Sequence, residues 1–78
     1  NIKLYNYGSS LMKLNKYEEA INLFKQAIKH GDNHPWLYYN TGLAYYNLED
    51  NENACLYFKK SSNLGEIVEP EYLEACID

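Results

Sequence analysis

Apolar residues recur along the chain at the three- and four-residue spacings of an amphipathic helix, and short polar stretches divide these stripes. Gly31 and Gly65 follow the second and fourth stripes, where a glycine in the left-handed conformation commonly ends a helix. Pro35 and Pro70 come next, at positions where a helix can begin because its first turn needs no amide hydrogen from them. The pattern predicts two helix–turn–helix units followed by the start of a fifth helix. The four stripes are Leu4, Tyr7, Leu11 and Leu14; Ala20, Leu23, Phe24, Ala27 and Ile28; Tyr38, Thr41, Tyr45 and Leu48; and Ala54, Tyr57, Phe58 and Ser61.

The two units are copies of one another. Displacing the sequence by 34 positions aligns residues 1–34 with residues 35–68 and gives nine identities, where composition alone would give about three. The same displacement carries Tyr38 onto Tyr72, so residues 69–78 are expected to begin a third unit or to form a C-terminal capping helix. The identical pairs are Tyr5/Tyr39, Asn6/Asn40, Gly8/Gly42, Leu14/Leu48, Glu18/Glu52, Ala20/Ala54, Phe24/Phe58, Lys25/Lys59 and Gly31/Gly65.

This repeat resembles the tetratricopeptide repeat, a 34-residue helix–turn–helix with small residues where its two helices cross and a phenylalanine beside them. The resemblance covers essentially the whole chain and implies an all-α protein, an α-α superhelix of antiparallel helix pairs with about five helices. Ser61, Asn51 and Cys76 depart from the pattern, so we expect the second unit and the fifth helix to pack less typically. The motif residues are Leu4, Tyr7, Gly8, Leu11, Ala20, Phe24 and Ala27 in the first unit and Tyr38, Thr41, Gly42, Tyr45, Ala54, Phe58 and Ser61 in the second.

The resemblance also implies that the first helix of each unit lines a concave surface that holds extended peptides or partner helices. Trp36, Tyr39, Leu43 and Tyr46 form an extra apolar series on the helix that starts near Pro35. Tyrosine and tryptophan suit recognition because each joins a large ring to a hydrogen-bonding tip. The alternative is that these side chains pack against adjacent helices of the same array. The candidate partner-binding residues are Tyr5, Asn6, Trp36, Tyr39, Asn40, Leu43, Tyr46 and Asn47.

The charge of the chain argues against polyanionic partners. Seven lysines, no arginine and 11 acidic residues give a net charge of -4, whereas nucleic-acid binders cluster Lys and Arg against phosphates. We therefore expect neither nucleic acid nor an acidic membrane surface as a partner. Counting charges along the sequence gives +2 for residues 1–34, -2 for 35–68 and -4 for 69–78, a gradient that would orient a ligand of mixed polarity.

Groups that could carry chemistry are sparse. His30 and His34 are four residues apart, but Gly31 interrupts the helix that would align them, and no nearby cysteine completes a zinc site. The paired acids, Glu18/Glu19 and Glu49/Asp50, lie at turns or helix starts, where a carboxylate favours the helix dipole. No nucleophile motif or phosphate-binding glycine loop is present. We expect no enzyme activity, no cofactor and no metal.

Two cysteines, Cys55 and Cys76, are too few for a disulfide framework and do not form a C-x-x-C pair. We expect both to be reduced thiols in the core. No signal-peptide pattern is present, so the cytoplasm is the default location.

The sequence thus predicts a non-catalytic module that binds a protein or peptide and is part of a larger protein. The alternative is self-association, as a homodimer formed through the same surface or through the open end of the solenoid. Some members of the family hold acidic tails with a clamp of Lys and Asn side chains, but only Asn40 matches that clamp here, while Tyr5, Ser9, Pro70 and Glu74 occupy its other positions. We expect no tight binding of such tails.

Overall fold

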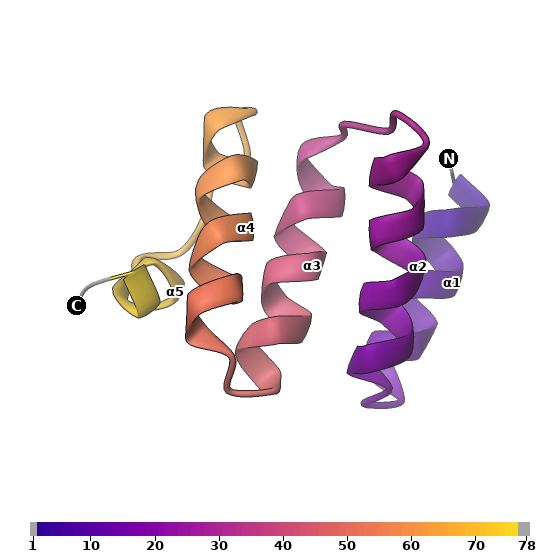
Figure 1. Cartoon of the computed structure of the whole chain (residues 1–78), viewed down its shortest axis with the longest axis horizontal. Helices are drawn as coiled ribbons and strands as arrows, with labels where there is room; N and C mark the ends of the chain where they lie inside the picture. Colours follow the sequence, from indigo (N-terminus) through magenta and orange to yellow (C-terminus); the bar gives the residue numbers. More distant parts are fainter. Residues whose placement is uncertain (1, 77–78) are drawn as a thin grey trace.

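Four long helices follow one another along the molecule in chain order, and a short C-terminal segment lies at one end of the row (Figure 1). The computed structural model describes residues 2–76, and within that range it leaves the side chains of Ile2, Lys3, Tyr5 and Ala75 undescribed. The helices are α1 (Ile2–Lys13), α2 (Tyr17–Lys29), α3 (Pro35–Asn47), α4 (Asn51–Asn63) and α5 (Pro70–Leu73), and α5 continues into the single 3-10 turn η1 (Glu74–Cys76).

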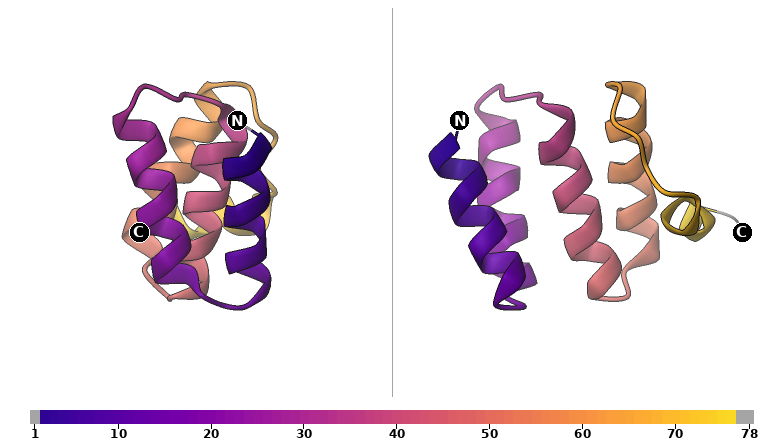
Figure 2. Two further views of the ribbon diagram at one scale, coloured as in Figure 1. Left: turned by 90° about the vertical axis from the view of Figure 1, so that its right-hand side faces the viewer. Right: turned by 180° about the vertical axis from the view of Figure 1, so that it is seen from behind.

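The helices form two layers, with α1 and α3 in one and α2 and α4 in the other (Figure 2). Each helix packs on the next one in the chain, α1 on α2, α2 on α3 and α3 on α4. The predicted all-α architecture of antiparallel helix pairs is confirmed. Among the helices of residues 2–76, none has the length and apolar character that crossing a bilayer requires.

The four long helices all end in the same way. Gly31 and Gly65 have φ angles of 103° and 104°, the left-handed conformation that was predicted for them. Asn15 and Glu49, which follow α1 and α3, take the same conformation with φ angles of 61° and 62°. After each helix, the amide of the left-handed residue and the amide that follows it donate to carbonyls in the last turn of the helix. After α2 these two bonds, from Gly31 and Asp32, are 3.0 and 3.1 Å long. The 34-residue period is therefore present in the backbone as well as in the sequence.

Two phenylalanines, 34 residues apart, fill the space between the paired helices. Phe24 and Phe58 are almost completely buried. A Cβ atom at Gly42 would lie 2.8 Å from two carbons of the Phe58 ring, and one at Gly8 would lie still closer to Phe24. The helices of each pair can therefore cross at this distance only because both positions are glycine. The two core clusters are Leu11, Ala20, Phe24, Ala27 and Leu37, and Ala54, Phe58 and Val68.

Ser61, a departure from the repeat pattern, is fully buried and has a partner. Its hydroxyl donates a 3.0 Å hydrogen bond to the carbonyl oxygen of Pro35. The bond joins the end of α4 to the start of α3. A buried hydroxyl at this position is therefore satisfied, which a sequence comparison alone could not show.

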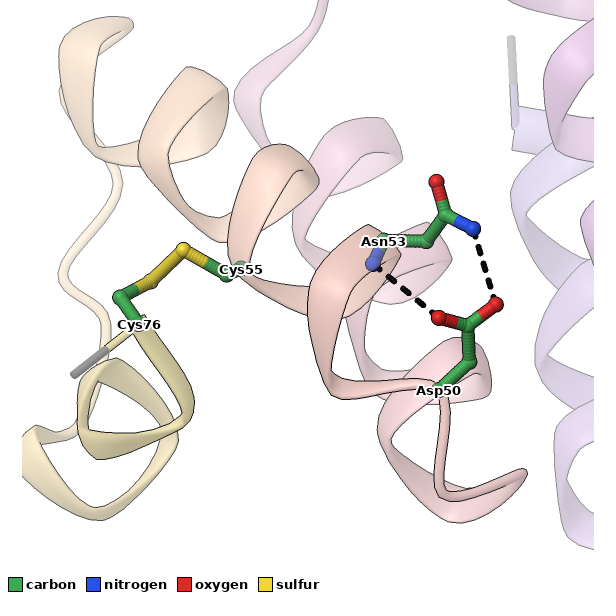
Figure 3. The surroundings of a disulfide bond; sticks show 4 residues. All are labelled: Asp50, Asn53, Cys55 and Cys76. Atoms are coloured by element: carbon green, nitrogen blue, oxygen red, sulfur yellow. Dashed lines mark hydrogen bonds between the residues drawn. A yellow bond between two sulfur atoms is a disulfide. The ribbon is translucent and has the colours of Figure 1, made fainter. Parts of the chain in front are cut away.

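The expectation that the two cysteines are reduced core thiols is wrong in this structure. Cys55 on α4 and Cys76 on η1 form a disulfide, with their Cα atoms 5.0 Å apart (Figure 3). Both are half-buried, and neither belongs to a core cluster. The bond forms because residues 69–76 turn back onto α4, a return that local sequence patterns do not reveal.

Candidate functional site

The predicted binding residues on α3 divide into a supporting pair and a more accessible group. Trp36 is half-buried against the first core cluster and stacks on the His34 ring at a centroid distance of 5.9 Å. Leu43 is half-buried against the second cluster. Both side chains therefore help hold α3 between its neighbours, which is the packing alternative raised for them from the sequence.

Tyr39 is half-buried and is engaged by the C-terminal segment. Its ring lies 5.8 Å from that of Phe58, and its hydroxyl donates a 2.5 Å hydrogen bond to the Glu69 carboxylate. Burial, and then the bond to Glu69, raises the pKa of Tyr39 above its ordinary value. The hydroxyl, which is protonated at neutral pH in any tyrosine, therefore keeps its proton to a higher pH here.

Tyr46 and Asn47 are the exposed members of the predicted set on α3. They line a hollow of about 600 Å³ together with Glu49 and Asn51, where α3 turns into α4. The hollow is open to solvent, so a partner would contact it from one side and would not be enclosed by it. The hollow thus offers one ring, two amides and one carboxylate at the open end of the α3 surface.

The amides of Asn40 and Asn47 are oriented by their own helix. Each Nδ2 donates to a carbonyl four residues earlier, Asn40 to Trp36 at 2.9 Å and Asn47 to Leu43 at 2.8 Å. These bonds turn each Oδ1 atom away from the helix backbone as an acceptor. The two amides are therefore suited to receive N–H groups of a partner rather than to donate to it.

On α1, Asn6 is exposed. The side chain of Tyr5, the other predicted site residue on this helix, lies outside the described part of the chain. The predicted set is thus brought together mainly on α3, with one described contribution from α1.

Sequence reasoning missed two residues that enter this surface, Tyr72 and Glu69. The Tyr72 ring lies 5.0 Å from the Tyr46 ring and 6.4 Å from the Tyr39 ring, in edge-to-face geometry with both. The alignment of Tyr72 with Tyr38 could have indicated a packed residue here, but it gave no indication that Glu69 bonds Tyr39. The C-terminal segment is therefore part of the candidate site.

The other tyrosines of α3 belong to a separate group. Tyr38 and Tyr45 stack on Tyr57 of α4, with ring centroids 6.3 and 5.6 Å apart. Lys25 and Lys60 each place their Nζ atom 5.7 Å from a ring of this group, over Tyr45 and Tyr57 respectively. These rings therefore join α3 to α4, and Lys25 adds a contact from α2.

Titratable groups do not gather into a metal site in the part of the chain that the structure describes. His30 follows the end of α2 and His34 precedes the start of α3, so the two belong to different helices. Asp50 is engaged locally, because its carboxylate accepts bonds from the Asn53 side chain at 2.8 Å and the Asn53 amide at 3.2 Å (Figure 3). These bonds lower the pKa of Asp50 and cap α4.

Comparison with known proteins identifies the repeat. A family model described as TPR repeat matches residues 8–49, and a second, described as tetratricopeptide repeat, matches residues 37–64. Neither the curated proteins nor the solved structures gave a match. The two matched ranges together reach from α1 to the end of α4.

Proposed function

Since this chain belongs to the tetratricopeptide repeat family, whose repeats generally serve as protein–protein interaction modules, we propose that its α1/α3 side binds a peptide or helix of a partner protein. Repeats of this kind are typically non-catalytic, in keeping with the sparse chemistry of the sequence. The observation that carries the proposal is the hollow beside Tyr46 and Asn47, the exposed part of the predicted set on α3. Tyr39 and Asn40 continue this surface along the same helix.

Binding would combine ring burial with backbone hydrogen bonds. Tyr46 supplies an exposed ring that a partner's apolar side chain can cover, and aromatic residues of this type often dominate interface energies. The Oδ1 atoms of Asn40 and Asn47 would accept hydrogen bonds from the partner's backbone N–H groups. Trp36 and Leu43 would act indirectly, by holding α3 in place. A ligand with an acidic end toward α1 and a basic end toward the C-terminal segment would match the charge gradient.

The test is selection of binding peptides from a display library against the full chain, followed by alanine substitution. Tyr46→Ala and Asn47→Ala are expected to weaken binding of the selected peptides, by tenfold or more for the tyrosine if it is a hot spot. Leu56→Ala is the matched control, because Leu56 is exposed on α4, in the other layer. Far-UV circular dichroism checks that every variant is folded. Peptides whose binding depends on Leu56 and not on Tyr46 or Asn47 would contradict the proposal.

A second candidate, self-association, is favoured by apolar side chains on the second unit. Leu56, Leu64 and Ile67 are 47%, 43% and 85% exposed. The positions one period earlier hold polar residues, so the first unit lacks these exposed apolar side chains. Sedimentation across a range of concentrations tests the idea: a dimer that Leu64→Ser dissociates would support it, and a monomer at all concentrations would exclude it. The earlier residues are Asn22, His30 and Asn33.

A further inference from the structure

The C-terminal segment occupies part of the surface proposed for partner binding. Tyr72 stacks on Phe58 at 5.3 Å and meets the Tyr46 ring at 5.0 Å. Three residues earlier, Glu69 accepts the hydroxyl hydrogen of Tyr39. The Glu69 carboxylate and the Tyr72 ring, about one helical turn apart, therefore both contact side chains of α3. The segment thus occupies this surface as a bound ligand would, although it belongs to the same chain.

The segment has little helical structure to hold it in place. α5 has four residues and η1 has three, whereas isolated helices need roughly a dozen residues or more to persist in water. Glu69, Glu71 and Glu74 carry the same charge, and no basic residue lies within residues 69–76 to offset it. Val68, which is buried in the second core cluster, fixes only the beginning of the segment. Its other end is fixed to α4 by the Cys55–Cys76 bond.

We propose that residues 69–76 are an internal ligand, which the Cys55–Cys76 disulfide holds on the surface formed by Tyr39 and Tyr46. Reduction of this bond frees the surface for a segment of a partner protein. The partner segment has the same chemistry as the internal ligand, an aromatic residue with a carboxylate three positions before it. This inference rests on the proposed function, since it assigns a ligand class and a control to the same surface. It differs from the clamp of the family, because the carboxylate is held by a tyrosine hydroxyl and not by lysines.

The covalent step is ordinary thiol–disulfide exchange with a dithiol reductant. A thiolate of the reductant attacks one Sγ atom, the other cysteine leaves as a thiolate and takes up a proton, and a mixed disulfide remains. The second thiol of the reductant then closes its own disulfide and releases the remaining cysteine. Two electrons and two protons pass from the dithiol to Cys55 and Cys76. Both cysteines are half-buried, and neither belongs to a core cluster.

Reduction alone opens the surface only partly. The segment stays attached through Val68, and a short tether keeps an internal ligand at an effective concentration on the order of millimolar. An external peptide must therefore compete with Tyr72 in the reduced chain. Removing both the bond and the Tyr72 ring is expected to give the tightest binding.

A labelled peptide with the sequence of residues 67–75 tests the inference by fluorescence anisotropy. Four forms of the full chain are compared: oxidised, reduced with dithiothreitol, Cys76→Ser, and Cys76→Ser combined with Tyr72→Ala. We expect no saturable binding to the oxidised form, weak binding to the reduced and Cys76→Ser forms, and at least tenfold tighter binding to the double variant. The control peptide carries alanine in place of its tyrosine and is expected not to bind. Equal binding to oxidised and reduced forms, or equal binding of the two peptides to the double variant, would overturn the inference.

Hydrogen exchange gives a readout that needs no ligand. Reduction is expected to speed exchange of the amides of Tyr72 and Leu73, which bond to the Glu69 carbonyl, by tenfold or more while α1–α4 keep their protection. Unchanged protection of these amides after reduction would show that the segment needs no bond to stay in place, and would also overturn the inference. The proposed function survives either failure if library peptides still depend on Tyr46, so the two ideas are tested separately.

Discussion

Replacing Gly8 with alanine is expected to destabilise the chain, because the new Cβ atom would overlap the Phe24 ring. Phe24 is almost fully buried and packs within the first core cluster, so its ring has little room to withdraw. The substitution adds one methyl group, the smallest change that probes the crossing of α1 and α2. Gly8 lies inside α1, so the left-handed conformation has no part in the effect.

Two opposing contributions set the magnitude. Overpacking a close contact costs about 1–3 kcal/mol, whereas alanine is about 1 kcal/mol better than glycine inside a helix. The net loss is therefore up to about 2 kcal/mol. Gly42→Ala gains the same helix propensity but meets Phe58 at the longer distance of 2.8 Å, so it is expected to cost less. The difference between the two variants isolates the overlap itself.

Urea and thermal unfolding followed by circular dichroism measure these losses. For a domain of this size 2 kcal/mol lowers the melting temperature by roughly 10 °C. Ser9→Ala, at the next position of α1, is the control and is expected to melt at or slightly above the wild-type temperature. If Gly8→Ala were as stable as the wild type, or more stable than Gly42→Ala, α1 would have to move away from α2 freely, and the argument from rigid packing would fail.

Three further changes test the turns, the α4 cap and the disulfide. Glu49 holds a φ of 62°, which costs a side-chain-bearing residue about 1 kcal/mol, so Glu49→Asn is expected to raise the free energy of unfolding by up to that amount in urea titrations. The bonds from Asn53 lower the pKa of Asp50 in the folded chain below its value of about 4 in the unfolded chain. The stability that these bonds give is therefore fully present above about pH 4 and is lost as the pH falls through the pKa of Asp50 in the folded chain. The urea midpoints of the wild type and Asp50→Ala should accordingly differ at pH 7 and converge toward pH 2; a constant difference would contradict the capping role. Because Cys55–Cys76 spans a sequence separation of 21, chain entropy predicts a stabilisation of about 3 kcal/mol if residues 69–76 stay docked after reduction, and a smaller one if they are released.

The repeat could be predicted from the sequence because its determinants are local. Phe24 and Phe58 repeat with their glycine partners at one spacing, and Gly31 and Gly65 mark turns through their own backbone preference. The spacing of apolar residues gave the helices for the same reason. A left-handed Glu49 was not predicted, because glutamate has no preference for that conformation and takes it only where the helix ending requires it.

The candidate site could be predicted less completely, because several of its features depend on contacts between distant residues. The extra series on α3 pointed to Tyr39 and Tyr46, but helical spacing does not say that Trp36 would pack into the first core cluster. The bond from Tyr39 to Glu69 joins residues 30 positions apart, and no periodic pattern encodes it. The side-chain amides of Asn40 and Asn47 can bond either to the helix backbone or to solvent, and composition does not determine which of the two occurs.

The disulfide adds a covalent attachment to the packing of a short segment. Ile21 on α2, one period before Cys55, is 8% exposed, and α2 packs on the 13-residue helix α3. Cys55 on α4 is half-buried, and the described segment that lies against α4 consists of the four residues of α5 and the three of η1. The bond between Cys55 and Cys76 fixes this segment to α4. Under our proposal, the contacts of Tyr72 with Tyr39 and Tyr46 therefore depend on redox conditions.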